Sequence, residues 1–158
     1  MYGPLQWYRD NIHIVEDEYS KVVEFIFLWQ EYNYYYHHEF PDIGDCRAAL
    51  NLYKKQVALE YYETIKDECI NAFMRIRSRD KNNNPRTYLC KDSRFQRKVE
   101  YNVNGHDTLR DFLSVVYQIR NNFLHGEKLW NENKEIDIKL ISWAKDYLEK
   151  LLNGSGIL

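Results

Sequence analysis

The chain has 158 residues, of which 44% are hydrophobic and 29% are charged, with only six glycines and three prolines. This length and composition suit a single globular domain, 1–158, with a sizeable core, and they exclude a chain that is disordered throughout. The formal net charge of −2 conceals an asymmetry, because residues 1–74 carry 6 basic and 13 acidic groups whereas residues 75–98 carry 9 basic and 2 acidic groups.

The cysteines and the N-terminal segment limit the compartment and the chemistry. Cys46, Cys69 and Cys90 are widely spaced, with no Cys-x-x-Cys pair and no His/Cys cluster. We therefore expect reduced thiols in a cytoplasmic protein, with no metal and no cofactor. The N-terminus has neither the basic nor the apolar part of a signal peptide, and the longest nonpolar run, 22–29, is too short to cross a bilayer, so we expect no membrane contact.

Two long helices are predicted in the first half of the chain. The first covers about 13–39 and ends before Pro41, since the residue preceding a proline disfavours the helical region. Its predicted apolar face is formed by Val15, Tyr19, Val22, Ile26 and Trp29. The second covers about 44–77 as one uninterrupted helix, because no glycine or proline follows Gly44 within it.

The second half is predicted to hold a basic insertion and two further helices. The insertion is irregular, and two strand-like pieces within 86–103 favour a small hairpin. The third helix begins at Thr108, which with Asp111 resembles a capping box, and closes at His125-Gly126. The fourth covers about 135–152. The predicted fold is an all-α, up-down bundle of four to five helices, with the first two forming a hairpin on which the others pack.

Arg120 breaks the pattern of the third helix. Apolar residues recur there at steps of three and four residues, and Arg120 lies in that buried stripe, four residues after Val116 and three before Phe123. An arginine is almost never fully buried without a partner, so this position indicates either a functional site or an internal ion pair. For the ion pair, the partners we considered are Asp111 and Asp146.

The segment Ile119-Arg120-Asn121-Asn122-Phe123-Leu124-His125-Gly126, between two bundle helices, resembles the HEPN family (higher eukaryote and prokaryote nucleotide-binding domain). That family's signature is an arginine followed four to six residues later by a histidine, often with Asn or Asp directly after the arginine. The resemblance covers about 105–152. It implies a metal-independent endoribonuclease that acts as a toxin or anti-phage effector on an RNA substrate, as a homodimer and with an antitoxin protein as a further partner.

The residue types suit this chemistry. RNA cleaves itself when its 2′-hydroxyl is activated and its 5′-oxygen is protonated, and histidine can do both near neutral pH. The resemblance implies that His125 is the general acid or base. It also implies that Arg120 clamps the phosphate, as an arginine fork can do for developing negative charge, and that Asn121 orients the histidine or the phosphate.

Helix geometry adds a constraint on this site. At about 100° and 1.5 Å per residue, Arg120 and His125 lie about 140° apart around the axis and about 7.5 Å apart along it. One straight helix cannot aim both at one phosphate. Either the turn after the helix redirects His125, or the site combines residues of two chains. We favour the second option, an isologous dimer through the third and fourth helices.

Two other groups of residues were weighed. The basic block is interpreted either as an RNA-binding surface or as a solvated loop; its candidate contacts are Arg75, Arg77, Arg79, Arg86, Arg94, Arg97 and Lys98. The sequence His37-His38-Glu39 is interpreted as the end of an amphipathic helix, since neighbouring helical side chains diverge and chelate poorly.

Three alternatives to an active nuclease remain open. The chain can be an inactive relative of the family, a non-catalytic module that binds nucleotide, RNA or protein, or a regulatory subunit whose acidic first half meets a basic partner.

Overall fold

The computed structural model describes residues 17–76, 89–92, 97–100, 108–124 and 134–158. Within these ranges the elements are α2 (Asp17–Glu39), α3 (Asp45–Leu50), the 3-10 turn η2 (Asn51–Lys54), α4 (Gln56–Ile76), β1 (Leu89–Asp92), β2 (Arg97–Glu100), α5 (Thr108–Leu124) and α6 (Lys134–Gly154). The predicted all-α bundle is confirmed. The fourth predicted helix matches α6 to within two residues, and α2 ends directly before Phe40-Pro41, as the proline rule requires.

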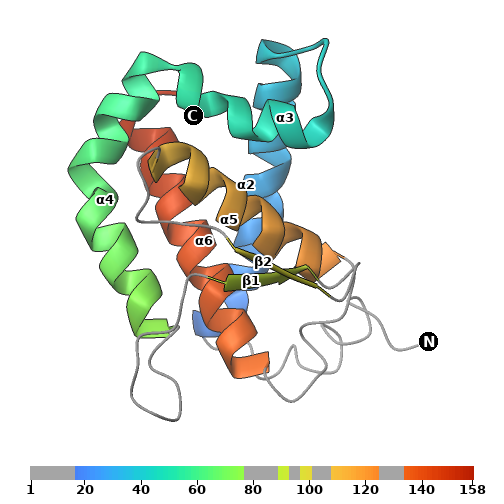
Figure 1. Ribbon diagram of the computed structural model, residues 1–158, viewed down its shortest axis with the longest axis vertical. Coiled ribbons are helices and arrows are strands. Elements are labelled where there is room, and N and C mark those ends of the chain that lie inside the picture. The colour runs from blue at the N-terminus through green and yellow to red at the C-terminus, as the bar shows by residue number, and fades with distance from the viewer. Residues whose placement is uncertain (1–16, 77–88, 93–96, 101–107, 125–133) are drawn as a thin grey trace.

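The helices are arranged around α6. Figure 1 shows α4 on one side of α6, α2 on the other and α5 in front, and α6 packs closely against all three. The short α3 joins α2 to η2 and packs against both α2 and α5. The predicted hairpin of the first two long helices is therefore wrong, because α6 separates α2 from α4.

The second long helix is also interrupted, contrary to the prediction for 44–77. After α3 the chain tightens into η2, and at Lys55 the backbone is extended, with φ −84° and ψ 117°. The corner buries Ala48, Ala49 and Leu52 almost completely, while the Tyr32 hydroxyl donates to the Ala49 carbonyl. A straight helix of this length, about 50 Å, would carry one of its two halves away from the core. Tertiary packing thus overrides the local preference for helix.

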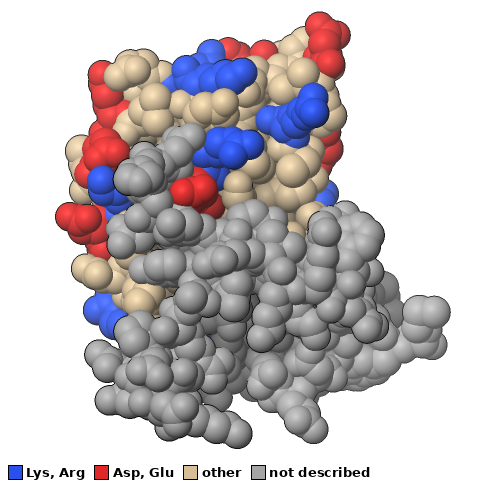
Figure 2. Space-filling view, viewed as in Figure 1, with Lys and Arg blue, Asp and Glu red and all other residues tan. Residues whose placement is uncertain are grey.

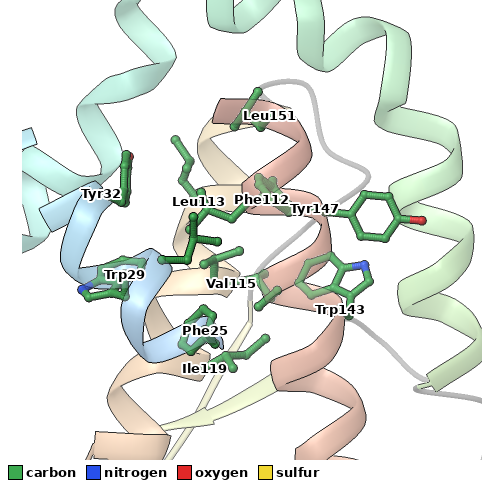
Figure 3. Close-up of a cluster of buried hydrophobic side chains, with 14 of the residues drawn as sticks. Phe25, Trp29, Tyr32, Phe112, Leu113, Val115, Ile119, Trp143, Tyr147 and Leu151 are labelled. Atoms are coloured by element: carbon green, nitrogen blue, oxygen red, sulfur yellow. The ribbon is translucent and has the colours of Figure 1, made fainter. Parts of the chain in front are cut away.

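The core fills the space on both sides of α5. In Figure 3, Phe25, Trp29 and Tyr32 of α2 lie on one side, and Trp143 and Tyr147 of α6 lie on the other, beside α4. On α2 the buried stripe follows steps of three and four residues through Val22, Phe25, Trp29, Tyr32 and Tyr36. The predicted face was wrong at Ile26, which is 37% exposed, while position 15 lies outside the described residues.

Helix α5 is buried on most of its circumference by its own chain. Its predicted stripe is confirmed, and further buried positions lie outside that stripe. The buried residues are Leu109, Phe112, Leu113, Ser114, Val115, Val116, Gln118, Ile119, Asn121, Asn122 and Phe123. Only Arg110 is exposed among its described side chains, and Arg120 is half-buried. Near the C-terminal end of α5, Arg120 is thus the described side chain that remains partly exposed, while its neighbours Asn121, Asn122 and Phe123 are buried.

The predicted hairpin in the insertion is confirmed, with shifted bounds. Strands β1 and β2 pair antiparallel, with Leu89 opposite Glu100 and Asp92 opposite Arg97. Strand β1 packs against α5. Among the described helices, none has the length and apolarity needed to cross a membrane.

Candidate functional site

A groove of about 640 Å³ opens between α2 and the C-terminal end of α5. Its walls combine aromatic rings with polar and basic side chains: Phe25, Ile26, Trp29, Gln30, Asn33, Tyr34, His37, His38, Arg120 and Phe123. The groove thus contains the arginine that the sequence singled out, together with the two histidines at the end of α2. The sequence alone predicts no function for those histidines.

Arg120 is held in place by three neighbours. Its Nη1 donates to Asn121 Oδ1 at 2.8 Å. Its guanidinium carbon lies 5.5 Å from the Trp29 ring centroid and 5.4 Å from that of Tyr117, within the range of cation–π attraction. Among the described residues, the Arg120 guanidinium is thus held by two rings and one amide.

The predicted internal ion pair is not found among the described residues. Asp146 instead binds Lys21 at 2.8 Å. Two buried nitrogens at the groove, Arg120 Nε and Trp29 Nε1, have no hydrogen-bond partner within the described ranges. The Tyr62 hydroxyl of α4 is in the same state away from the groove, so an unpaired donor does not by itself mark a binding site.

Asp45, the first residue of α3, accepts hydrogen bonds from side chains of two other helices. Its Oδ2 accepts from the Tyr117 hydroxyl of α5 at 2.7 Å. Its Oδ1 accepts from the Tyr36 hydroxyl at 2.8 Å and lies 2.8 Å from His37 Nε2, both on α2. Asn33 Nδ2 approaches the same oxygen at 3.3 Å. One carboxylate therefore ties α2, α3 and α5 together beside the groove.

The electrostatics of this cluster favour an ionised Asp45. Burial alone would raise the pKa of Asp45, but hydrogen bonds from Tyr117, Tyr36 and His37 and the charge of Arg120 lower it below its usual range. Burial and the bond to Asp45 raise the pKa of both Tyr36 and Tyr117, so both phenols stay protonated and keep donating.

Asn121 lies beside Arg120, and its described side-chain hydrogen bond is with that arginine. The side chain is 3% exposed and its carbonyl oxygen accepts from Arg120. It therefore orients the arginine; its predicted action on a histidine or a phosphate stays a prediction. His125, the predicted acid or base, lies outside the described residues.

The basic block is only partly described. Arg75 lies exposed in the last turn of α4, where its charge acts on the pKa of Glu68 and Tyr147, so it lies on the α4–α6 side and not at the groove. Arg97 and Lys98 belong to β2, of which the structure describes the backbone. The others, Arg77, Arg79, Arg86 and Arg94, fall outside the described ranges.

On the face drawn in Figure 2, the charges of the described residues do not single out a binding surface. Figure 2 shows lysines and arginines interspersed there with aspartates and glutamates among uncharged residues. Within the described ranges, no three His, Cys, Asp or Glu side chains are placed to hold a metal ion. Cys46 is exposed and Cys69 is buried, and neither forms a disulfide with a described residue.

Sequence reasoning missed the Asp45 cluster, because its partners come from separate elements and Tyr117 is 72 positions from Asp45. The one available signal was the density of tyrosines in Tyr34-Tyr35-Tyr36, next to histidines at a helix end. Comparison of the chain with protein-family models, with curated proteins and with solved structures found no match.

Proposed function

We propose that this protein is a metal-independent endoribonuclease of the HEPN type, which cleaves RNA by attack of a 2′-hydroxyl on the adjacent phosphate. Arg120 binds that phosphate, Asn121 orients the arginine, and His125 transfers a proton. The observation that carries the proposal is the state of Arg120. Its guanidinium is fixed by Asn121, Trp29 and Tyr117 at the wall of a groove, and no carboxylate among the described residues lies within ion-pair distance.

The groove offers one exposed ring beside such a phosphate. Tyr34 is 70% exposed, whereas Trp29 and Phe123 line the groove as buried rings, and base–aromatic stacking contributes about 1–3 kcal/mol per base. A fixed arginine beside a stacking surface matches a ligand that combines negative charge with flat rings. RNA is such a ligand, and its 2′-hydroxyl supplies the nucleophile without a metal.

We further propose a homodimer in which the ends of α5 and α6 meet their copies and a toxin or anti-phage setting with an antitoxin protein as partner. The middle of α5 is already buried by its own chain. Asn121, Asn122 and Phe123 near its C-terminal end are buried too, so in this proposal α5 meets its copy through the half-buried Arg120. Sedimentation-equilibrium mass in solution tests the dimer, and a concentration-independent monomer mass contradicts it.

The experiment that tests the activity compares variants on a labelled single-stranded RNA in the presence of EDTA. Arg120→Ala is expected to lower kcat by about 10²–10³-fold, as for removal of a transition-state donor. Arg120→Lys keeps the positive charge but loses the two-pronged guanidinium, so its kcat is expected to lie between those of Arg120→Ala and the wild type. Arg110→Ala is the matched control, because Arg110 is exposed on the same helix and does not line the groove. Its guanidinium carbon lies 5.8 Å from the Tyr53 ring centroid.

Circular dichroism confirms that each variant is folded. The proposal is overturned if the wild type leaves RNA intact, if EDTA abolishes cleavage, or if Arg120→Ala cleaves as the wild type does.

A second candidate function, binding of nucleotide or RNA without cleavage, is favoured by the aromatic lining of the groove alone. It predicts saturable binding of the same RNA, weakened by Trp29→Ala, with no cleavage product. In that case Arg120→Ala lowers affinity and changes no rate.

A further inference from the structure

His37 has the geometry of an activated histidine. It lies in the last turn of α2, and its side chain is 44% exposed, on the wall of the groove that also contains Arg120. Its Nε2 lies 2.8 Å from Asp45 Oδ1. An ionised carboxylate can only accept, so Nε2 carries the proton and donates. The other ring nitrogen, Nδ1, is then left as an acceptor.

The carboxylate that holds His37 is itself fixed. Tyr36 and Tyr117 donate to its two oxygens from two different helices. Those bonds remain if His37 is removed, so Asp45 does not need the histidine to be satisfied. An exposed ion pair of this kind contributes at most about 1 kcal/mol to stability. A structural explanation for the His37–Asp45 contact is therefore weak, whereas an orienting carboxylate behind a histidine is a recurrent catalytic arrangement.

We propose that His37 is a catalytic general base of the RNA cleavage reaction and that Asp45 is its positioning residue. This inference rests on the proposed ribonuclease function and adds a second proton-transfer group to it. Such a reaction moves two protons, one off the nucleophile and one onto the leaving group, and one histidine serves both poorly because it must be unprotonated for the first and protonated for the second.

The step balances as follows. His37 Nδ1 takes the proton from the 2′-hydroxyl, the 2′-oxygen forms a bond to phosphorus, and the bond from phosphorus to the 5′-oxygen breaks. Arg120 stabilises the negative charge on the non-bridging oxygens. The 5′-oxygen leaves with a proton, which His125 donates under the proposed function. The products are a 2′,3′-cyclic phosphate and a 5′-hydroxyl end.

Among the described residues, the titratable and charged groups near His37 can be named. Asp45 lies on α3, Tyr117 and Arg120 on α5, and Tyr36 and His38 on α2 itself. Asp45 is deprotonated and both tyrosines are protonated near neutral pH. If kcat/KM rises with pH in the wild type and does not rise in His37→Gln, the rise is therefore caused by this imidazole.

The deciding variant is His37→Gln, whose amide can still donate to Asp45 but cannot titrate. The matched control is His38→Gln, because His38 lines the same groove but stacks on Tyr34, with ring centroids 5.1 Å apart, and has no described contact with Asp45. We expect His37→Gln to lower kcat/KM at neutral pH by about 10²–10⁴-fold and to remove the rise with pH. His38→Gln alters the groove wall, so the two variants are compared only on the rise with pH, which His38→Gln is expected to keep.

A second substrate separates base from acid. In RNA with sulfur in place of the scissile 5′-oxygen, the leaving thiolate needs no proton. We expect His37→Gln to stay slow on this substrate.

If His37→Gln recovers the wild-type rate on the thio substrate, or keeps the wild-type rate and profile on ordinary RNA, the assignment of His37 is overturned while the ribonuclease stands. If the wild type cleaves neither substrate at any pH, the proposed function itself fails, and the role of His37 fails with it.

Discussion

The two tryptophans within the described ranges, Trp29 and Trp143, are both buried but have different surroundings. Trp143 Nε1 donates to the Cys69 carbonyl at 3.0 Å, and its ring packs on Phe73 and Phe112 at centroid distances of 4.8 and 5.4 Å. Trp29 is equally enclosed, 7% exposed, yet its Nε1 has no partner among the described residues and its ring faces Arg120. The α4–α6 side satisfies the N–H of its tryptophan, although the Tyr62 hydroxyl of α4 has no hydrogen-bond partner among the described residues. The α2–α5 side leaves both the Trp29 N–H and Arg120 Nε unpaired.

The largest effect on stability is expected on the α4–α6 side. Phe112→Ala removes a fully buried ring that contacts Tyr62 and Trp143. We expect the free energy of unfolding to fall by about 3–5 kcal/mol in urea denaturation, because a cavity replaces the ring. Phe27→Ala, at a position 60% exposed, serves as the control and should change it by less than about 0.5 kcal/mol. Similar losses in the two variants would contradict the described core.

A smaller loss is expected at the polar cluster. Asp45→Asn replaces an acceptor oxygen with a donor, so Tyr36, Tyr117 and His37 can no longer all be satisfied. We expect a loss of about 1–3 kcal/mol in the free energy of unfolding, near the lower end because the side chain is 37% exposed. Asp67→Asn, on the exposed side of α4, is the matched control. Equal stability of the two variants would show that the cluster holds nothing together.

The contrast between the tryptophans can be tested directly. Trp143→Phe deletes a hydrogen bond, and Trp29→Phe deletes an unpaired N–H while keeping a ring for Arg120. The loss of ring size is comparable, so Trp143→Phe is expected to cost about 1 kcal/mol more in unfolding free energy. An equal or greater cost at Trp29 would mean that its N–H is paired, and the comparison between the two interiors would fail.

The smallest effects concern pH. The folded pKa of Asp45 is lowered, so its contribution to stability is present above its unfolded pKa of about 3.9 and is lost as pH falls through the folded pKa. The folded pKa of Tyr117 is raised, so its contribution is present below about pH 10 and is lost as pH rises further. Denaturation measured from pH 7 to each extreme should show both slopes in the wild type, with the acid slope reduced in Asp45→Asn.

Elements with regular local patterns could be predicted from the sequence, and features that depend on distant contacts could not. The stripe of α5, the bounds of α6 and the end of α2 before Pro41 follow from periodicity and turn chemistry. The break at Lys55 could not be predicted, because it depends on how η2, with its buried Leu52, packs against α5.

The candidate site divides in the same way. Arg120 and Asn121 were identified from one helix. Asp45 and His37 were not, because their significance arises only when α3 is placed against the end of α2 and against Tyr117 of α5.

The spacing of the donors around Asp45 also has a consequence for the order of folding. Tyr36 and His37 are 9 and 8 positions from Asp45, so the chain can close these contacts early and at little entropic cost. Tyr117 is 72 positions away and arrives only when α5 docks. The groove wall around His37 can thus form from α2 and α3 alone. The wall that contains Arg120 is added last, when α5 docks. In kinetic terms, the Arg120 guanidinium is expected to reach its place on the groove wall only after most of the core is closed.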